Sequence, residues 1–234
     1  MQSDRETLHY TEALDRLHRL LAPKTYLEIG TLTGTTLRLA RCASIAIDPS
    51  FSQLDKDVFA GKPSCFFFQM KSDDFFARYS PSVLLGRPVD MAFLDGMNYA
   101  EFLLRDFINI ERHVTRNSLV ILHDCIPSSI EMATRDLELG AAWTGDVWKV
   151  VPILKKYRPD LRIHAIDAPP TGLIICTNLN PDSRILEDRY FAILEEFATF
   201  DLGKIGIPGL WQLLGVIGTD TIASHESVTQ HFWL

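Results

Sequence analysis

Short apolar runs alternate with polar and amphipathic stretches along most of this chain. Each run is too short for a buried helix and is bounded by turn-forming residues, which is typical of buried strands. The segments between the runs have helical spacing, so the pattern predicts a mostly parallel sheet built from alternating strands and helices. The expected strands cover residues 26–29, 43–48, 64–70, 88–95 and 118–124.

Two further apolar runs, at residues 161–166 and 171–176, are separated by the short segment 167–170. A parallel crossover needs about a dozen residues or more, so these two strands must be antiparallel. Five strand–helix units followed by this hairpin predict an α/β fold. We expect a three-layer, Rossmann-like sheet of seven strands, mostly parallel, with a C-terminal antiparallel hairpin.

Helices are expected on either side of the strands. Ser3 or Asp4 can cap a first helix that ends near Leu21. A second helix is expected at residues 35–41, directly after the first strand. Ser72 or Asp73 can cap the helix that follows the third strand.

The chain divides at about residue 180. Residues 1–180 are expected to form the main domain with its N-terminal helix. Residues 181–234 are expected to form a helical extension, in which residues 181–200 make one helix. This extension carries large apolar side chains that something must cover: the main domain, a second copy in a homodimer, or a substrate lid. They are Trp211, Leu213, Leu214, Phe232 and Trp233.

Composition narrows the function classes. The hydrophobic content of 47% and charged content of 23% are ordinary globular values. The net charge of −7 argues against a nucleic-acid partner. No apolar run approaches the ~20 residues of a membrane span, and the start of the chain lacks the pattern of a secretory signal. The four cysteines form no C-x-x-C pair, so we expect a reduced, cytoplasmic protein.

Polar, titratable residues recur where the expected strands end. They are Glu28, Asp48, Asp95, His123 and Asp124. The carboxyl ends of parallel strands meet at one edge of a sheet, and ligands of open α/β sheets bind beyond that edge. The sequence therefore predicts a functional site there.

The segment from Tyr26 to Thr36 indicates what this site binds. A strand, a turn containing Gly30 and Gly34, and an expected helix start form a place for an adenosine-type ligand. The pyrophosphate-binding G-x-G-x-x-G pattern is not met. Glu28 instead precedes the first glycine, which suits an ammonium or sulfonium group. Asp48, twenty residues further on, is placed to accept the ribose hydroxyls.

This stretch resembles motif I of class I S-adenosylmethionine (SAM)-dependent methyltransferases, with Leu32 in place of the middle glycine. Across about residues 20–178 the chain resembles the small-molecule methyltransferases of methyltransferase family 24. The runs that carry this likeness are 27–31, 71–76, 93–101, 122–127 and 143–149. The resemblance implies SAM as the cofactor and O-methylation of a small molecule such as a sugar or secondary metabolite. The cofactor-binding residues it indicates are Glu28, Gly30, Thr31, Gly34, Thr35, Asp48, Ser72, Asp73 and Asp95.

Two mechanisms of proton removal remain open. The resemblance implies a divalent metal held by Asp95 and Asp124, and hard oxygen ligands favour Mg²⁺ or Ca²⁺. Alternatively, His123 acts as a base beside Asp124 without a metal. If the strand stays regular, these two side chains point to opposite faces, which counts against both being ligands. The chain departs from its relatives at Asn98, where a histidine is common, and at Cys125, where catechol-type enzymes have a carboxamide. The expected catalytic set is Asp95, Asn98, His123 and Asp124.

Two other function classes also fit the pattern. The chain could bind SAM or S-adenosylhomocysteine (SAH) without transferring a methyl group, which the replacements at Leu32 and Asn98 would allow. It could also be a Rossmann oxidoreductase, which the missing G-x-G-x-x-G and the terminal hairpin disfavour.

Overall fold

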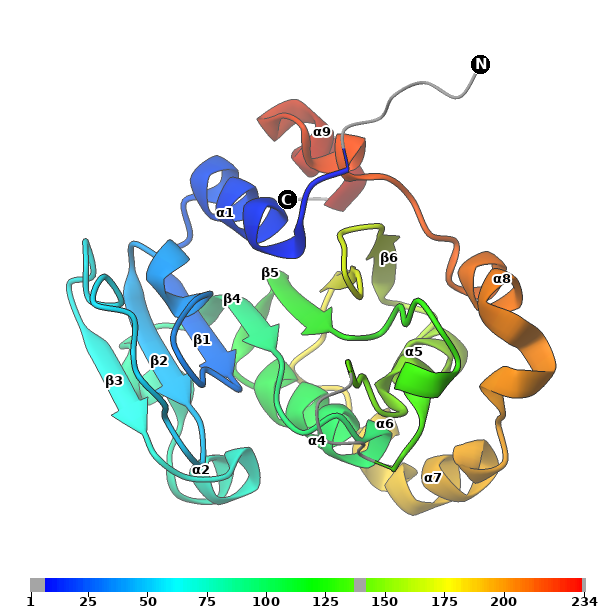
Figure 1. Ribbon diagram of the computed structural model, residues 1–234. Helices are drawn as coiled ribbons and strands as arrows, with labels where there is room; N and C mark the ends of the chain where they lie inside the picture. Colours follow the sequence, from blue (N-terminus) through cyan, green and yellow to red (C-terminus); the bar gives the residue numbers. More distant parts are fainter. Residues whose placement is uncertain (1–6, 137–141, 233–234) are drawn as a thin grey trace.

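The computed structural model describes residues 7–136 and 142–232 of the chain. Seven strands form one sheet in the order β3-β2-β1-β4-β5-β7-β6 (Figure 1). The strands are β1 Thr25–Ile29, β2 Ala43–Ile47, β3 Cys65–Phe68, β4 Val89–Leu94, β5 Val114–His123, β6 Arg162–Ile166 and β7 Leu173–Thr177.

The pairing of the strands confirms the predicted fold class. The pairs β2–β3, β1–β2, β1–β4 and β4–β5 are parallel, whereas β5–β7 and β6–β7 are antiparallel. Strand β7 lies between β5 and β6, so the start of the hairpin strand reaches the carboxyl end of β5, where His123 faces Leu173. This insertion places the turn before β7 beside the predicted site.

Helices and short 3₁₀ turns cover both faces of the sheet. The α-helices are α1 Tyr10–Leu21, α2 Ser72–Arg78, α3 Pro81–Leu84, α4 Ala100–Glu111, α5 Val150–Tyr157, α6 Ile185–Asp188, α7 Tyr190–Ala198, α8 Leu202–Leu214 and α9 His225–Phe232. The 3₁₀ turns are η1 Leu37–Leu39, η2 Glu131–Ala133, η3 Val147–Lys149 and η4 Thr219–Ile222.

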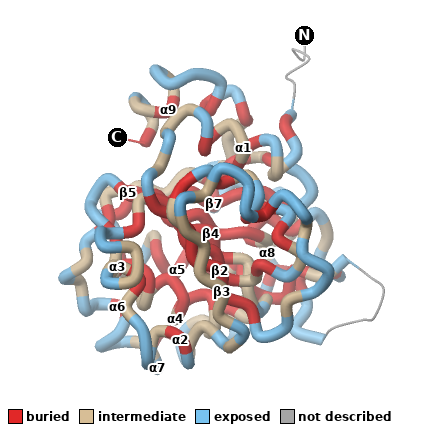
Figure 2. Tube along the Cα trace, turned by 90° about the vertical axis from the view of Figure 1, so that its left-hand side faces the viewer, coloured by how far each residue is buried: buried red, intermediate tan, exposed pale blue. Residues whose placement is uncertain are grey.

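Two apolar cores lie on opposite faces of the sheet. Side chains of α1 and α9 pack on one face, and side chains of α4, α5 and α8 pack on the other. In Figure 1, α1 and α9 lie above the sheet, and α2, α4 and α7 lie below it. Strands β1, β2, β4 and β7 are buried almost throughout, whereas the edge strand β3 is only partly buried (Figure 2). The apolar runs therefore predicted strands because both faces of the sheet are covered.

The first helix begins later than predicted. His9 is the N-cap of α1: its side chain accepts from the Thr11 amide, and Glu12 completes a capping box. The proposed caps Ser3 and Asp4 lie outside the described residues. Helix α1 then continues to Leu21, as expected, and buries Leu14 and Leu17 against the sheet.

The predicted helix at residues 35–41 is wrong, because this segment contains only the 3₁₀ turn η1. The loop before it bonds to the loop after β2. The Ser52 amide donates to the Leu32 carbonyl (2.9 Å), and the Asp55 amide donates to the Thr33 carbonyl (2.8 Å). These bonds fix the loop backbone so that a regular helix does not start, and the expected row of free helix N–H groups is missing.

Two other helix boundaries differ from the prediction. Lys71 is the N-cap of α2, and Ser72 is already the first helical residue, so neither Ser72 nor Asp73 caps this helix. Residues 181–200 form two helices, α6 and α7, which are separated at Arg189. Helix α8 is kinked at Gly206, which has a φ of 66° and lies two residues before Pro208.

The C-terminal segment packs on the sheet. Leu210 and Leu214 of α8 belong to one core, and Val228 and Phe232 of α9 belong to the other. Trp211 and Leu213 stay partly exposed, and Trp233 lies outside the described residues. The division at residue 180 and the homodimer stay predictions. Within the described ranges, no helix has both the length and the apolar character needed to cross a membrane.

Candidate functional site

Three titratable side chains meet where β4 and β5 end. His123 Nδ1 lies 3.0 Å from Asp95 Oδ1 and 3.4 Å from Asp124 Oδ1. One ligand atom from each residue lies within 4.8 Å of the others. The side chain of His123 is only 7% exposed, against 26% for Asp95 and 15% for Asp124. The imidazole therefore lies beneath two carboxylates that reach the surface.

The backbone at Asp124 decides how this cluster forms. Strand β5 ends at His123, and Asp124 has a φ of +59°. Few residues other than glycine adopt this left-handed conformation, although aspartate tolerates it better than most. It ends the alternation of side chains between the two faces of the strand and turns the Asp124 side chain back towards His123. The expectation that these side chains point to opposite faces is therefore wrong.

Two further side chains hold the Asp124 carboxylate. The Thr171 hydroxyl donates to Asp124 Oδ1 (2.6 Å). The Asn98 amide nitrogen donates to Asp124 Oδ2 (2.9 Å) and to the Trp143 carbonyl (3.1 Å). Because that carbonyl can only accept, it fixes Asn98 with its amide nitrogen facing Asp124. All four predicted catalytic residues are thus brought together.

Sequence reasoning missed Tyr10 and Thr171. The Tyr10 ring lies against His123 with ring centroids 4.3 Å apart, and the Tyr10 amide donates to the Pro169 carbonyl (2.9 Å). Thr171 precedes β7, so the antiparallel pairing of β7 with β5 could have placed it beside His123. No sequence signal placed Tyr10, because the N-terminal helix can dock on the sheet in many ways.

The environment of the cluster shifts its ionisation. Burial raises the pKa of Asp95, and the neighbouring Asp124 raises it further, while His123 opposes both effects. Burial alone would lower the pKa of His123, but Asp95 and Asp124 outweigh it, so the pKa of His123 is raised. Burial and the same two carboxylates raise the pKa of Tyr10, which keeps its phenol protonated.

The edge formed by β1 and β2 differs, because the chain itself fills it. Gly30 has a φ of +84°, and a Cβ there would lie 1.8 Å from the Asp95 carbonyl oxygen. A Cβ on Gly34 would lie 2.5 Å from Val58. Both glycines therefore permit close contacts within the chain.

The carboxylate of Asp48 is bonded on both oxygens. It accepts from the Leu32 amide (2.7 Å) and from the Ser50 amide (2.7 Å). A carboxylate oxygen accepts more than one hydrogen bond, so each retains a lone pair for a ribose hydroxyl. Leu32 itself has a φ of +45° and is 55% exposed, at the position where the motif has a glycine.

Glu28 is fully buried beneath this loop. Its Oε2 accepts from the Tyr26 hydroxyl (2.6 Å). Burial raises the pKa of Glu28 to about 7, against the opposing effects of Tyr26, Thr36 and Thr31. Even so, Glu28 Oε1 and Thr31 Oγ1 have no hydrogen-bond partner of good geometry. An ammonium group would satisfy both oxygens, so these residues fit SAM chemically, but the loop at 31–36 must shift to admit it.

The remaining predicted cofactor residues lie further away or have other partners. The Thr35 hydroxyl is 2.9 Å from that of Thr33. Arg105 binds the Asp73 carboxylate through three hydrogen bonds of 2.7 to 3.1 Å. Ser72 interacts with the buried Asp106, whose pKa is raised by burial to about 7. These contacts tie α2 to α4.

Asp95, His123 and Asp124 offer a divalent ion two carboxylates and an imidazole, whose ligand atoms lie within 4.8 Å of one another. In this structure these groups are bonded to one another and to their neighbours: His123 faces Asp95, and Asp124 accepts from Thr171 and Asn98. The imidazole nitrogen suits a transition metal better than Mg²⁺, which prefers oxygen ligands.

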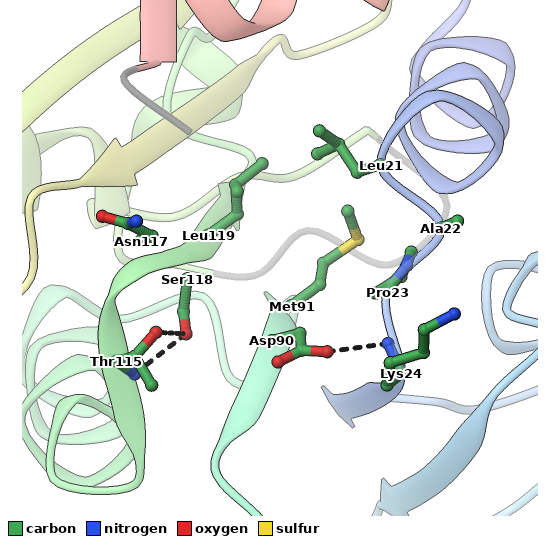
Figure 3. Close-up of a pocket in the computed structure, with 10 residues that line it drawn as sticks. All are labelled: Leu21, Ala22, Pro23, Lys24, Asp90, Met91, Thr115, Asn117, Ser118 and Leu119. Atoms are coloured by element: carbon green, nitrogen blue, oxygen red, sulfur yellow. Dashed lines mark hydrogen bonds between the residues drawn. The ribbon is translucent and has the colours of Figure 1, made fainter.

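A separate cleft of about 330 Å³ lies at the opposite edge of the sheet (Figure 3). It lies between the end of α1 and the amino ends of β4 and β5. Asp90 is held there by the Lys24 amide (2.7 Å). None of the predicted site residues lines this cleft.

No family model matches the sequence, and no curated protein matches it. Solved structures do match the fold. Cofactor-bound Rv0187 from MTB has a TM-score of 0.56 at 14% identity, covering 73% of this chain and 80% of that one.

Two O-methyltransferases give similar values. TomG from Streptomyces achromogenes, in complex with SAM, has a TM-score of 0.52 at 16% identity, covering 73% and 80% of the two chains. The Bacillus cereus enzyme, in complex with SAH, has a TM-score of 0.53 at 12% identity, covering 71% and 79%. This chain has the class I methyltransferase fold. The likeness to family 24 rests on the sequence runs described above.

Proposed function

We propose that this protein transfers a methyl group from SAM to a hydroxyl group of a small molecule. The observation that carries the proposal is the cluster of Asp95, His123 and Asp124 at the carboxyl edge of a methyltransferase fold. Structural neighbours with this fold include O-methyltransferases in complex with SAM and SAH. SAM supplies the electrophilic methyl group when it is bound.

The chain's own residues divide these tasks between the two ends of the carboxyl edge. At the β1–β2 end, Glu28, Gly30, Thr31 and Asp48 would hold SAM, with Glu28 receiving its ammonium group and Asp48 its ribose. At the β4–β5 end, Asp95 is the best-placed proton acceptor. One of its oxygens faces His123, and the other has no hydrogen-bond partner among the described residues. Its raised pKa makes it a stronger base than an ordinary aspartate.

The reaction then needs two contributions from the protein. Asp95 takes the proton of the acceptor hydroxyl, and the resulting oxygen nucleophile forms the bond to the methyl carbon while SAH leaves. Asn98, Thr171 and His123 hold Asp124 and Asp95 in place during this transfer. Orientation of the two reactants contributes the rest of the rate gain.

SAH binding tests the cofactor assignment. Wild-type protein and Asp48→Ala are titrated with SAH by calorimetry. Loss of the ribose bonds should weaken binding about tenfold or more, since each charge-assisted hydrogen bond contributes roughly 1.5–3 kcal/mol. Equal affinity would remove Asp48 from the ribose role. Absence of SAH binding to the wild type would contradict the proposed function.

A SAM- or SAH-binding protein without transferase activity is the second candidate. Asn98 favours it, because its amide nitrogen is bonded to Asp124 and to the Trp143 carbonyl and an amide cannot take a proton from an acceptor hydroxyl. Release of SAH from SAM in the presence of a panel of hydroxylated small molecules separates the two candidates.

A further inference from the structure

We infer that a second cleft, at the edge of the sheet opposite to the candidate site, binds a small organic anion. This cleft lies between the last turns of α1 and the segments that lead into β1 and β2, and its volume is about 530 Å³. Sites for small molecules have volumes of ~300–1,000 Å³. None of the residues that line it belongs to the proposed methyl-transfer site, so the two sites can be tested separately.

Two cations that line the second cleft have no acidic partner. The backbone amide of Lys24 is bonded to Asp90, but its ammonium has no ion-pair partner among the described residues, and in Figure 3 its side chain extends away from Asp90. The Arg41 guanidinium donates to the carbonyls of Arg38 (3.1 Å) and Ala60 (2.8 Å), and within the described part of the chain it meets no carboxylate. Two unpaired positive charges in a cleft attract an anion, even on a protein of net charge −7.

The other charges around the cleft do not cancel these two. Asp15 is the only acid that lines it, and this carboxylate is already paired with Arg19 at 3.0 Å. Lys62 adds a third positive charge nearby, because its ammonium donates to two backbone carbonyls, at 2.6 and 2.8 Å, rather than to an acid. The cleft is therefore positive overall.

A buried imidazole at the cleft has unused hydrogen-bonding capacity. His18 lines the cleft and is only 6% exposed, and neither ring nitrogen has a hydrogen-bond partner among the described residues. Its ring packs edge-on against Tyr26, with centroids 4.9 Å apart, and the Tyr26 hydroxyl is used in its bond to Glu28. Burial and the charges of Lys62 and Arg41 lower the pKa of His18 to about 4, so the ring is neutral at pH 7. It then has one N–H to donate and one nitrogen that accepts.

These groups together describe the ligand. Its anionic group would lie between Lys24 and Arg41. A polar group beside it would satisfy a nitrogen of His18, whose burial without a partner costs free energy. The body of the ligand would be short and apolar, because the remaining walls are largely apolar; they include Ala22, Pro23, Leu39 and Pro63. A small organic carboxylate or phosphate ester has this chemistry.

NMR titration of the full-length, ¹⁵N-labelled protein tests the site without SAM or an acceptor. The probes are phenyl phosphate, benzoate and the neutral benzamide. We expect saturable shifts of the Lys24 and Arg41 amides and of the His18 ring signals with the two anions, and binding of benzamide at least ~5-fold weaker. Anion binding should also weaken as NaCl is added. The anion that binds more tightly shows whether the site prefers a phosphate or a carboxylate.

Three variants locate the anion. Lys24→Gln and Arg41→Gln each remove one exposed charge and should weaken binding about fivefold. His18→Phe keeps a ring against Tyr26 but has no hydrogen-bonding group, so a similar loss is expected. Arg38→Gln is the matched control. It removes a neighbouring exposed arginine whose charge is paired with Asp55 at 3.1 Å, and it should match the wild type.

Three results would each overturn the assignment. The first is the absence of saturable shifts with both anions. The second is binding of benzamide as tight as that of benzoate, which would make the cleft an apolar pocket without preference for charge. The third is wild-type affinity in both Lys24→Gln and Arg41→Gln, which would place the anion elsewhere. These two variants change exposed side chains, so the test stands even if His18→Phe does not fold.

Discussion

The two halves of the ligand-binding edge use similar residues in different ways. At the β1–β2 end, the carboxylates of Glu28 and Asp48 are buried and bonded within the chain, to Tyr26 and to backbone amides. At the β4–β5 end, the carboxylates of Asp95 and Asp124 reach the surface and are joined by an imidazole. Acids at strand ends are thus enclosed in the fold at one end of this edge and reach the surface at the other.

The difference has a local cause. The loop after β1 is bonded to the loop after β2, so its polar groups are used in holding the two loops together. Strand β5 instead ends in the left-handed Asp124, which turns its side chain into the cluster. The first end must open to receive a cofactor, whereas the second is already arranged.

The largest effect on stability is expected at Gly30, where the loop after β1 contacts the backbone after β4. Gly30→Ala places a Cβ 1.8 Å from the Asp95 carbonyl oxygen at a φ of +84°. The backbone must move, so we expect a loss of unfolding free energy of about 4 kcal/mol or more, measured by urea denaturation. Gly86→Ala is the matched control, because its φ is +71° and no atom lies within 4 Å. It should lose only about 1 kcal/mol, and equal losses would show that φ alone matters.

Asp95→Asn should separate chemistry from stability. Loss of the proton acceptor should lower kcat about 10²-fold or more, because general-base catalysis contributes at least that much. The unfolding midpoint should change little, since this side chain is partly exposed. Asp90→Asn, at the other end of the same strand, should keep its activity. If Asp95→Asn keeps wild-type kcat once an acceptor is known, Asp95 is not the base.

Glu28→Gln should change how the stability of the protein depends on pH, because it removes the buried acid at the β1–β2 end. The pKa of Glu28 is about 7 in the folded protein, above its ordinary value of 4.5, so the folded state binds the proton more tightly. Its stabilising contribution is full below pH 4.5 and is lost as the pH rises to about 7. The variant should therefore gain up to about 3 kcal/mol over wild type between pH 5 and pH 8.

Urea denaturation at both pH values measures this gain. Glu195→Gln, at an exposed position on α7, should show no comparable change with pH. A constant difference between Glu28→Gln and wild type across the range would mean that Glu28 is ionised throughout.

The smallest effect is expected at Leu32. Its φ of +45° is unfavourable for leucine, and glycine would adopt it freely. Relief of this strain stabilises the folded state, but the freedom that glycine gains in the unfolded chain offsets part of the effect. Leu32→Gly should therefore stabilise the protein by less than about 1 kcal/mol. Thermal unfolding measures this change. A clear loss of stability would show that the exposed leucine makes contacts that matter more than its backbone strain.

Local pattern predicted the strands well. The apolar runs that end at Ile29, Ile47 and Leu94 are strands because both faces of the sheet are covered, and the short connection at 167–170 required an antiparallel pair. Strand direction then placed the ends of β4 and β5 side by side, so the meeting of Asp95 with Asp124 could be predicted from the sequence alone.

Contacts between distant segments decided the rest. The helix expected at 35–41 does not form, because the loop before it bonds to residues 52 and 55. Tyr10 covers His123 only because α1 docks with its first turn over the ends of β4 and β5. The sequence determined which residues lie at the sheet edge, because strand periodicity is local. The tertiary structure decided which of them are buried, bonded or free, because that depends on what packs against each one.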